Sequence, residues 1–180
     1  MFNLKLKILE APHLEGCRRL SSMISINPGL CTGCHLCELV CSTYHFSKSS
    51  TELSRVIVYK DKASAKFTPT LCVSCPGMPC AKACPTGAII KDDRTGMPIV
   101  LVEKCSSCGE CVKECPYNAI RFEPSVYAYP LICDLCNGDP QCVNVCWPGA
   151  LTRATTLTEK FKGAAEARSI IVKIVSKYTR

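Results

Sequence analysis

Four stretches of the sequence each carry four closely spaced cysteines, and the cysteine thiolate is a ligand of both zinc and iron–sulfur clusters. The members of the four groups, in chain order, are Cys31, Cys34, Cys37 and Cys41; Cys72, Cys75, Cys80 and Cys84; Cys105, Cys108, Cys111 and Cys115; and Cys133, Cys136, Cys142 and Cys146. The third group is followed by Pro116 and reproduces the run C-x2-C-x2-C-x3-C-P of bacterial ferredoxins. The other groups keep the opening C-x2-C and the closing x3-C. The spacing therefore predicts 4Fe-4S clusters.

Zinc is the main rival explanation for these groups. A structural zinc site takes two cysteine pairs per metal and needs no regular third and fourth member. Here every C-x2-C pair continues with a third cysteine and then with x3-C, so the pattern favours iron over zinc. A zinc-bound interaction module stays as the less favoured alternative.

A secreted disulfide framework is the third explanation of 17 cysteines in 180 residues. The first residues, MFNLKLKILEAPHLEG, lack the apolar core of a secretory signal because Lys5 and Lys7 interrupt it. The pair Arg18-Arg19 is not followed by an apolar region either, and the apolar runs elsewhere are far shorter than a membrane span. We expect a cytoplasmic protein without a direct membrane span, where stable disulfides are not expected.

The tails of three groups repeat at a constant interval, which indicates an internal repeat. They are CPTGAII from Cys84, CPYNAIRF from Cys115 and CWPGALT from Cys146. The apolar pair near the end of each tail would pack beside a cluster and keep water from its sulfurs. Trp147 stands where the other two tails have proline, and we predict that it shields the cluster or packs at a partner interface.

Short strands and one long helix are the elements that would hold these groups. The segments 55–61 and 65–71 flank a polar turn, and AIIKDD and MPIVLV flank Arg94-Thr95-Gly96, so both predict β-hairpins. Residues 2–9 alternate apolar and basic side chains as a strand does. From Thr158 onward the apolar spacing predicts a helix that covers the domain's own core.

The formal charge of +7 counts the cysteines as neutral. An oxidised 4Fe-4S core of charge +2 held by four thiolates carries −2, so four clusters would nearly cancel the positive charge. No aromatic-rich basic stripe of the kind that stacks bases is present either. We therefore do not expect nucleic acid as a partner.

Two of the three histidines lie close to the cysteine groups, and one cysteine lies outside those groups. His35 and His45 adjoin predicted ligands, and they either donate hydrogen bonds that tune the reduction potential or are simply packed or exposed. Cys17 has no partner group and is predicted to be a free thiol.

The four groups in this order resemble the four-cluster iron–sulfur electron-transfer subunits of molybdenum and tungsten enzymes. The iron–sulfur subunits of DMSO reductase and formate dehydrogenase are relatives of this family. The compact fourth group, CDLCNGDPQC, and the segment ELSRVIVYKD (52–61) resemble in particular the small subunits of aldehyde:ferredoxin oxidoreductase-type tungsten enzymes, such as tungsten benzoyl-CoA reductase. The resemblance covers about residues 24–152.

The resemblance implies that the first group pairs with the fourth and the second with the third. Carried onto this sequence, the implied ligands are Cys31, Cys34, Cys37 and Cys146 for cluster 1; Cys41, Cys133, Cys136 and Cys142 for cluster 2; Cys72, Cys75, Cys80 and Cys115 for cluster 3; and Cys84, Cys105, Cys108 and Cys111 for cluster 4. The first and fourth groups end Cys41-Ser42 and Cys146-Trp147 instead of Cys-Pro. Because some relatives lack one cluster, four clusters are expected, or three if a site of this irregular pair is empty.

The implied fold is α+β, with tandem bacterial-ferredoxin-like modules, short β-hairpins, short helices and a C-terminal helix. One two-cluster module is expected to be inserted in the other. The expected divisions are an N-terminal strand or extension over 1–23, a four-cluster domain over 24–152 made of an outer module (24–50 plus 125–152) and an inserted module (51–124), and a C-terminal helical extension over 153–180.

The resemblance implies a non-catalytic electron-transfer subunit. It would relay single electrons between a catalytic tungsten or molybdenum oxidoreductase subunit and another redox partner, either a further redox subunit or a soluble ferredoxin. The sequence itself offers no set of residues for chemistry on a substrate. A freestanding polyferredoxin that serves several enzymes is the alternative.

Overall fold

The structure is a computed structural model that describes residues 23–178, in which most regular elements are short. The strand expected over residues 2–9, the Arg18-Arg19 pair and Cys17 lie outside the described residues.

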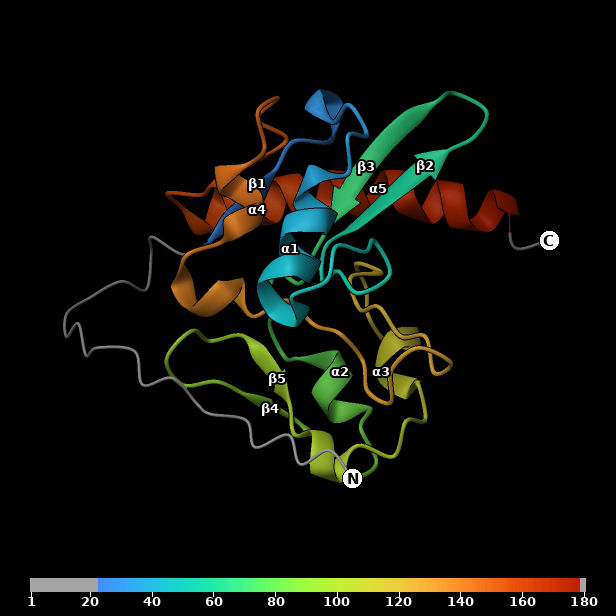
Figure 1. Cartoon of the computed structure of the whole chain (residues 1–180), viewed down its shortest axis with the longest axis vertical. Helices are drawn as coiled ribbons and strands as arrows, with labels where there is room; N and C mark the ends of the chain where they lie inside the picture. The colour runs from blue at the N-terminus through green and yellow to red at the C-terminus, as the bar shows by residue number, and fades with distance from the viewer. Residues whose placement is uncertain (1–22, 179–180) are drawn as a thin grey trace.

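Two-stranded antiparallel sheets are the β component of the fold (Figure 1). The pairs are β1 (Ile24–Ile26) with β6 (Leu151–Arg153), β2 (Ile57–Asp61) with β3 (Lys66–Thr70), and β4 (Ile89–Lys91) with β5 (Pro98–Val100). Both predicted hairpins are confirmed. In each turn an aspartate side chain holds the backbone, as Asp61 accepts the N–H of Ala63 at 3.0 Å and Asp92 accepts that of Thr95 at 2.9 Å. The β1–β6 pair joins two distant segments of the chain.

Short helices carry the cysteines. They are α1 (Leu36–Phe46), α2 (Pro79–Lys82), α3 (Glu110–Lys113) and α4 (Gln141–Asn144), together with the 3-10 turns η1 (Pro28–Leu30), η2 (Val102–Lys104) and η3 (Leu135–Gly138). Each of the four α-helices contains the third cysteine of one group. The C-terminal helix α5 (Leu157–Tyr178) is confirmed and begins one residue before its expected start.

The length of α1 explains why the first group departs from the Cys-Pro pattern. α1 continues through Cys41 to Phe46, whereas α2 and α3 end before the fourth cysteine of their groups. Ser42 is fully buried in the helix, where its hydroxyl donates to the Leu39 carbonyl at 2.9 Å and accepts the N–H of Ser50 at 3.0 Å. A proline at position 42 would lie inside the helix and would interrupt it.

α5 lies along one face of the molecule and packs against β1 and β3 (Figure 1). Its inner side chains are small or aliphatic, with Ala164, Ala167 and Ile171 almost fully buried. Gly163 permits the approach, because a Cβ at that position would lie 2.1 Å from the Ile26 carbonyl oxygen. Within residues 23–178 no helix is long and apolar enough to cross a membrane.

The core has two parts. One lies among α1, β1, α4 and α5 and contains Ile24, Leu151 and Ile171 together with cysteines of the first and fourth groups. The other surrounds Ile89 and Ile120 and contains cysteines of the second and third groups. α1 packs against α4, and α2 against α3, so the two parts occupy opposite ends of the molecule in Figure 1.

Candidate metal centres

Each cysteine group begins with a loop that enters the left-handed backbone region two residues after its first cysteine. The residues at that position are Gly33, Ser74, Ser107 and Leu135, with φ of 71°, 49°, 56° and 60°. A left-handed residue inside a tight turn points successive N–H groups toward one side and forms a concavity that suits an anionic centre. Only Gly33 is a glycine, so the sequence does not reveal this shared turn.

The structure brings the sixteen cysteines together in four sets. In set 1, Cys31, Cys34, Cys37 and Cys146 line one small cavity. The pKa of Cys37 is raised to about 12, mainly by burial and also by the neighbouring Glu38 carboxylate and the other three thiols of the set. The fourth group thus contributes its last cysteine to the loop of the first group.

Set 2 consists of Cys41, Cys133, Cys136 and Cys142, all of which are buried. Burial raises the pKa of Cys133 well above its usual value, and the thiols of Cys142 and Cys41 add to the effect. Cys41 also lies close enough to raise the pKa values of Cys136 and Cys142, again after the larger effect of burial.

Set 3 consists of Cys72, Cys75, Cys80 and Cys115. The pKa of Cys72 is raised to about 12, mainly by burial and also by the thiols of Cys115, Cys80 and Cys75, while a backbone hydrogen bond at Ser74 acts to lower it. Cys115, from the third group, therefore lies with three cysteines of the second.

Set 4 consists of Cys84, Cys105, Cys108 and Cys111, which line one small cavity. The pKa of Cys111 is raised to about 11, mainly by burial, then by the thiol of Cys80 of set 3 and by the three other thiols of set 4. Cys84 differs: burial raises its pKa, but hydrogen bonds from Thr86 and from backbone N–H groups outweigh burial, so that its pKa is lowered.

The four sets form a row. Thiols of neighbouring sets interact electrostatically between Cys37 and Cys142, between Cys133 and Cys72, and between Cys80 and Cys111. These interactions indicate that the sets follow one another in the order 1, 2, 3, 4. Each end set has one exposed cysteine, Cys34 in set 1 and Cys108 in set 4. The row therefore reaches the surface at both ends.

The chemistry of the donors fits a bound metal cluster. The sixteen cysteines are free thiols, and burial raises the pKa of nine of them above the ordinary value for cysteine. A buried thiol gives up its proton when a metal coordinates it. Four sulfurs at one point, in loops that present backbone N–H groups, match the ligand requirement of a 4Fe-4S cluster.

Two models of the 4Fe-4S dicluster domain match this chain, one over residues 63–156 and the other over residues 30–90. The first match alone spans more than half of the sequence. The chain belongs to the 4Fe-4S dicluster family. The predicted iron–sulfur chemistry and the predicted count of four clusters are thereby confirmed, since each dicluster domain accounts for two.

Two relatives place this dicluster protein among oxidoreductase subunits. It is 43% identical over 123 residues to the aliphatic sulfonate oxidoreductase, polyferredoxin-like subunit, of Pyrococcus furiosus, covering 68% of this chain and 70% of that one. It is 32% identical over 140 residues to the NADH-dependent phenylglyoxylate dehydrogenase subunit beta of Aromatoleum evansii, covering 77% of this chain but only 31% of that one. The resemblance to iron–sulfur electron-transfer subunits is thus confirmed.

A solved structure, the active site complex BamBC of benzoyl coenzyme A reductase with benzoyl-CoA, includes a chain that is 25% identical to this dicluster protein. The match covers 86% of this chain and 90% of that one, with a TM-score of 0.40. A superposition of that quality carries no inference about function.

In the dicluster protein a backbone N–H donates to the sulfur of the fourth cysteine in every group. Ala88 donates to Cys84 at 3.2 Å, and Ala119 donates to Cys115 at 3.4 Å. In these two groups the donor is four residues away, and the tail between is a tight turn. Hydrogen bonds to a cluster sulfur are one of the means by which a protein adjusts the reduction potential.

The first and fourth groups achieve the same bond differently. Leu151 donates to Cys146 at 3.2 Å, so the donor lies five residues after the cysteine instead of four, in a tail of the same length that has Pro148 one position later. Cys41, inside α1, accepts from the backbone of Arg55 at 3.3 Å, on a different segment. The irregular ends thus keep the hydrogen bond to sulfur, although its donor has changed.

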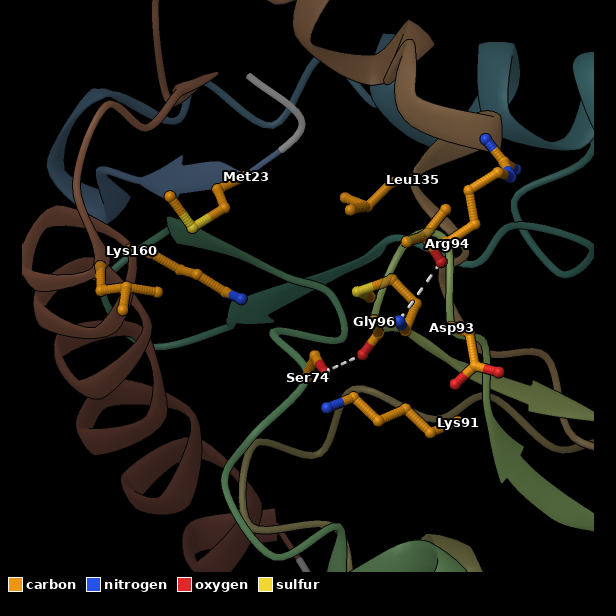
Figure 2. A pocket seen from close by; sticks show the side chains of 11 residues that line it. Met23, Ser74, Lys91, Asp93, Arg94, Gly96, Leu135 and Lys160 are labelled. Carbon is orange, nitrogen blue, oxygen red and sulfur yellow. Dashed lines mark hydrogen bonds between the residues drawn. The ribbon is translucent and has the colours of Figure 1, made fainter. Parts of the chain in front are cut away.

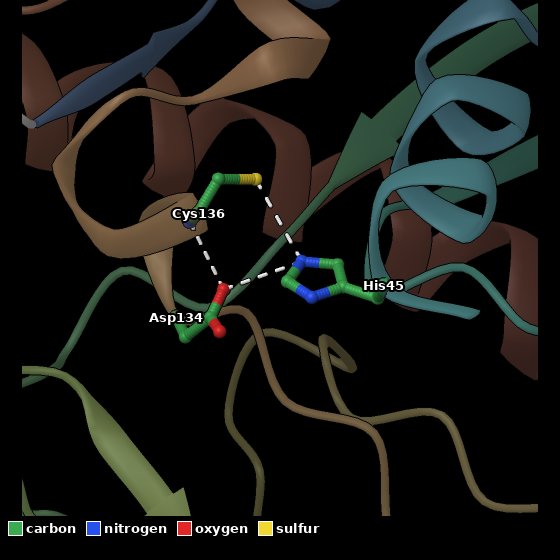
Figure 3. Close-up of side chains that lie close together, drawn as sticks. All are labelled: His45, Asp134 and Cys136. Atoms are coloured by element: carbon green, nitrogen blue, oxygen red, sulfur yellow. Dashed lines mark hydrogen bonds and ion pairs between the residues drawn. The ribbon is translucent and has the colours of Figure 1, made fainter. Parts of the chain in front are cut away.

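His45 lies beside set 2 (Figure 3). Its Nε2 is 3.7 Å from the Cys136 sulfur and 3.4 Å from Asp134 Oδ1. Burial, with a contribution from Arg55, lowers the pKa of His45 to about 4, so the ring is neutral at pH 7. The geometry agrees with a hydrogen-bond donor to the sulfur. The ligand atoms of His45, Asp134 and Cys136 lie within 4.8 Å of one another, so these three side chains could together hold a metal ion.

Asp134 and Arg55 are residues that the sequence did not single out. Asp134 Oδ1 accepts the N–H of Cys136 at 3.0 Å, and Oδ2 binds the Arg55 guanidinium at 2.5 Å. Arg55 is therefore connected to set 2 in two ways. Its backbone N–H donates to the Cys41 sulfur, and its guanidinium binds Asp134, which accepts the N–H of Cys136. The sequence could have indicated the role of Asp134, because this aspartate lies between two cysteines and an aspartate at the start of a turn often accepts a hydrogen bond from the backbone.

Glu38 is a buried carboxylate beside set 1 that the sequence also did not reveal. It is only 3% exposed, and it pairs with Arg121 at 2.9 Å and with His35 at 2.5 Å. Its Oε1 also accepts the N–H of Val58 at 3.1 Å. His35 thus pairs with a carboxylate, and the negative charge of Glu38 stands next to Cys37.

Trp147 does not shield set 1. Its side chain is 72% exposed, so that part of the prediction is wrong. The Trp147 N–H donates to the Val145 carbonyl at 2.9 Å in the turn that follows α4. Leu30 and Leu36, at 47% and 42%, are exposed on the two segments that flank the first cysteine loop. A role at a partner interface stays a prediction.

Proposed function

We propose that this chain is an electron-transfer subunit, which relays single electrons along a row of four 4Fe-4S clusters between a catalytic oxidoreductase subunit and a second redox partner. The observation that carries the proposal is the arrangement of the sixteen cysteines in four neighbouring sets, which follow one another in a row and reach the surface at both ends. A bound 4Fe-4S cluster supplies one-electron chemistry.

We infer that sets 1 to 4 are the ligands of clusters 1 to 4. The assignment is supported by the proximity of Cys146 to the first cysteine loop, of Cys41 to the fourth group, of Cys115 to the second and of Cys84 to the third. In each case the fourth cysteine of one group completes the set of its partner group. Exchange of this kind brings two clusters close together, as in two-cluster ferredoxins.

The chain's own residues then have three tasks. Their thiolates hold the iron, and backbone N–H groups from Ala88, Ala119, Leu151 and Arg55 donate to sulfur and stabilise negative charge there. The buried surroundings exclude water from the middle of the row. Exposed Cys34 and Cys108 mark the two places where an electron would enter or leave.

The nested arrangement belongs to the same proposal. An outer module over 24–50 and 125–152 would hold clusters 1 and 2, and the inserted module over 51–124 would hold clusters 3 and 4. The pairing of β1 with β6 supports it, because it joins the two ends of the outer module. The cysteines buried in the two parts of the core support it as well, because one part contains Cys37, Cys41, Cys133 and Cys142 and the other contains Cys80 and Cys111.

The chain is proposed to be non-catalytic and to depend on a partner for chemistry on a substrate. By their names, the two relatives are subunits of oxidoreductases. That the partner holds tungsten or molybdenum rests on the resemblance of the cysteine groups, and a cytoplasmic location rests on the expectation that so many free thiols need a reducing compartment.

Anaerobic purification tests the proposal. We expect about sixteen irons per chain with an equal amount of acid-labile sulfide, and co-elution in fixed stoichiometry with a larger oxidoreductase. Zinc without sulfide would overturn the relay. A fully loaded monomer that never co-elutes with an enzyme would support the freestanding polyferredoxin instead.

A further inference from the structure

The buried face of α5 begins with a charged residue. Its inner positions recur at alternating steps of four and three residues, and they are Lys160, Ala164, Ala167, Ile171 and Ile174. The last four are apolar, as expected for a helix that covers a core. Lys160 is only 9% exposed at a position where the pattern calls for an apolar side chain. Lysine is almost never buried to this extent unless a negative charge compensates it.

No carboxylate supplies that compensation. Within residues 23–178, no aspartate or glutamate oxygen lies within 4.0 Å of the Lys160 ammonium. Its ring contact is with Phe161, whose centroid is 5.3 Å from Nζ. A cation–π contact of this length with a phenyl ring is too weak to offset the desolvation of an ammonium group.

The side chain extends from α5 into a cavity of about 390 Å³, toward Ser74 and Leu135 (Figure 2). The other charged groups on the cavity wall come from the β4–β5 hairpin and are Lys91, Asp93 and Arg94. The Arg94 guanidinium is bound to Asn137, at 2.9 Å from its side chain and 3.1 Å from its carbonyl. The walls of this cavity therefore carry more positive than negative charge.

Cysteine sulfurs are the negative partners that the structure offers. Burial lowers the pKa of Lys160, and the thiols of Cys72, Cys75 and Cys133 act in the opposite direction. Cys72 and Cys75 belong to set 3 and Cys133 to set 2, and Cys133 and Cys72 also interact with each other. Ser74, inside the loop of set 3, and Leu135, inside the loop of set 2, line the same cavity as Lys160, so the ammonium lies between the two middle sets of the row.

We propose that Lys160 is a tuning residue of the middle step of the relay, whose ammonium stabilises added negative charge on clusters 2 and 3 and raises the reduction potentials of both. The proposal rests on the proposed function and on its ligand sets. An oxidised cluster with four thiolates carries −2 and gains one more negative charge on reduction, so a fixed cation nearby favours the reduced form.

The helix that supplies this cation, α5, begins at Leu157. It therefore lies outside the region matched by the dicluster models, which stops at residue 156. Gly163, one turn after Lys160, lets α5 lie directly against the Ile26 backbone and so sets how deeply the ammonium reaches. The C-terminal helix therefore does more than cover the core, because it places a charge where the two halves of the row meet.

The test is an EPR-monitored redox titration of the anaerobically purified holoprotein and three variants. Lys160→Met removes the charge and keeps the length, Lys160→Arg keeps the charge, and Lys162→Met removes an exposed charge on the same helix as a matched control. In Lys160→Met we expect two of the four midpoint potentials to fall by about 59 mV each. For a one-electron centre this corresponds to a tenfold smaller equilibrium constant for reduction. Lys160→Arg should restore them, and Lys162→Met should leave all four unchanged.

Iron content separates the failure of this inference from failure of the relay itself. Wild-type protein with about sixteen irons and four one-electron centres supports the proposed function whatever the variants do. Unchanged potentials in a fully loaded Lys160→Met protein would overturn the tuning role. If Lys160→Met loses iron, Lys160→Gln is titrated in its place, and loss of iron in both with full retention in Lys160→Arg would show a structural role instead.

Discussion

The two ends of the molecule hold similar cysteine loops in different surroundings. At one end, which we call the regular half, the second and third groups end in Cys-Pro and Cys84 and Cys115 receive their N–H bonds from four residues away. At the other, the charged half, the first and fourth groups have irregular ends, and Cys41 receives its bond from Arg55 on another segment. Side-chain charges stand close to sulfur there, with Glu38 beside set 1 and Asp134 beside set 2.

This difference separates local from tertiary support. In the regular half a short tail contains both the ligand and its hydrogen-bond donor, so the loop can adopt its shape from nearby residues alone. In the charged half the ion pairs Arg121–Glu38 and Arg55–Asp134 connect segments that are distant in the sequence. We therefore expect the charged half to respond more strongly to substitutions away from the ligands, and its clusters to be tuned more by charge.

The largest expected effect is the loss of a buried ligand. Cys133→Ala should lower the iron content from about sixteen to about twelve or less and reduce the yield of soluble protein, because all four cysteines of set 2 are buried. Cys108→Ala, at the exposed end of set 4, should lose about four irons with little loss of yield. Iron and sulfide analysis after gel filtration measures both.

Cys17→Ala is the matched control for the two ligand variants. Since Cys17 lies outside the four groups, it should keep the full iron content. Equal losses of yield in Cys133→Ala and Cys108→Ala would remove the distinction between the two halves.

The next largest effect, on the free energy of unfolding, is expected when the residue after the fourth cysteine of a group is replaced. Ser42→Pro should destabilise the protein by about 3 kcal/mol, because proline in the interior of α1 removes a helical hydrogen bond and clashes with the preceding turn. The reverse change in the regular half, Pro85→Ser, should cost about 1 kcal/mol or less. Anaerobic thermal unfolding of the holoprotein compares them, and similar costs at both positions would sink the idea that α1 excludes proline.

A smaller effect is expected from removing the buried negative charge beside set 1. Glu38→Gln should cost about 1–3 kcal/mol, since it weakens a buried ion pair and leaves Arg121 without its charged partner. It should also raise one midpoint potential, because a neighbouring carboxylate disfavours reduction.

The control for Glu38 is Glu110→Gln in the regular half. Glu110 pairs with Lys113 at 2.6 Å, but both side chains are exposed, so the change should stay within about 0.5 kcal/mol and leave the potentials unchanged. If Glu38→Gln and Glu110→Gln changed the free energy of unfolding and the midpoint potentials equally, buried charge would not distinguish the two halves.

Much of this arrangement follows from local sequence, and the rest does not. The cysteine groups, the two hairpins and α5 were predictable, because spacing, turn residues and apolar periodicity are local patterns. The ligand sets came from a family resemblance, since no spacing rule says that Cys146 joins the loop at Cys31. Glu38 could not be predicted at all, because Arg121, its partner, is brought to it only by the tertiary fold.

The smallest effect on the chain itself is expected at Trp147, where the charged half shows its most exposed large apolar side chain. Trp147→Ala should leave the iron content and all four midpoint potentials unchanged and alter the free energy of unfolding by no more than about 0.5 kcal/mol, since the indole is 72% exposed.

Tryptophan is enriched among residues that dominate binding at protein interfaces. If the catalytic partner docks over set 1, the same variant should weaken the complex by about 2 kcal/mol or more, roughly thirtyfold in Kd. Val102→Ala, exposed at 48% beside the third cysteine group, is the matched change in the regular half and should leave that affinity unchanged. A complex weakened by Val102→Ala and not by Trp147→Ala would place the catalytic partner at the other end of the row.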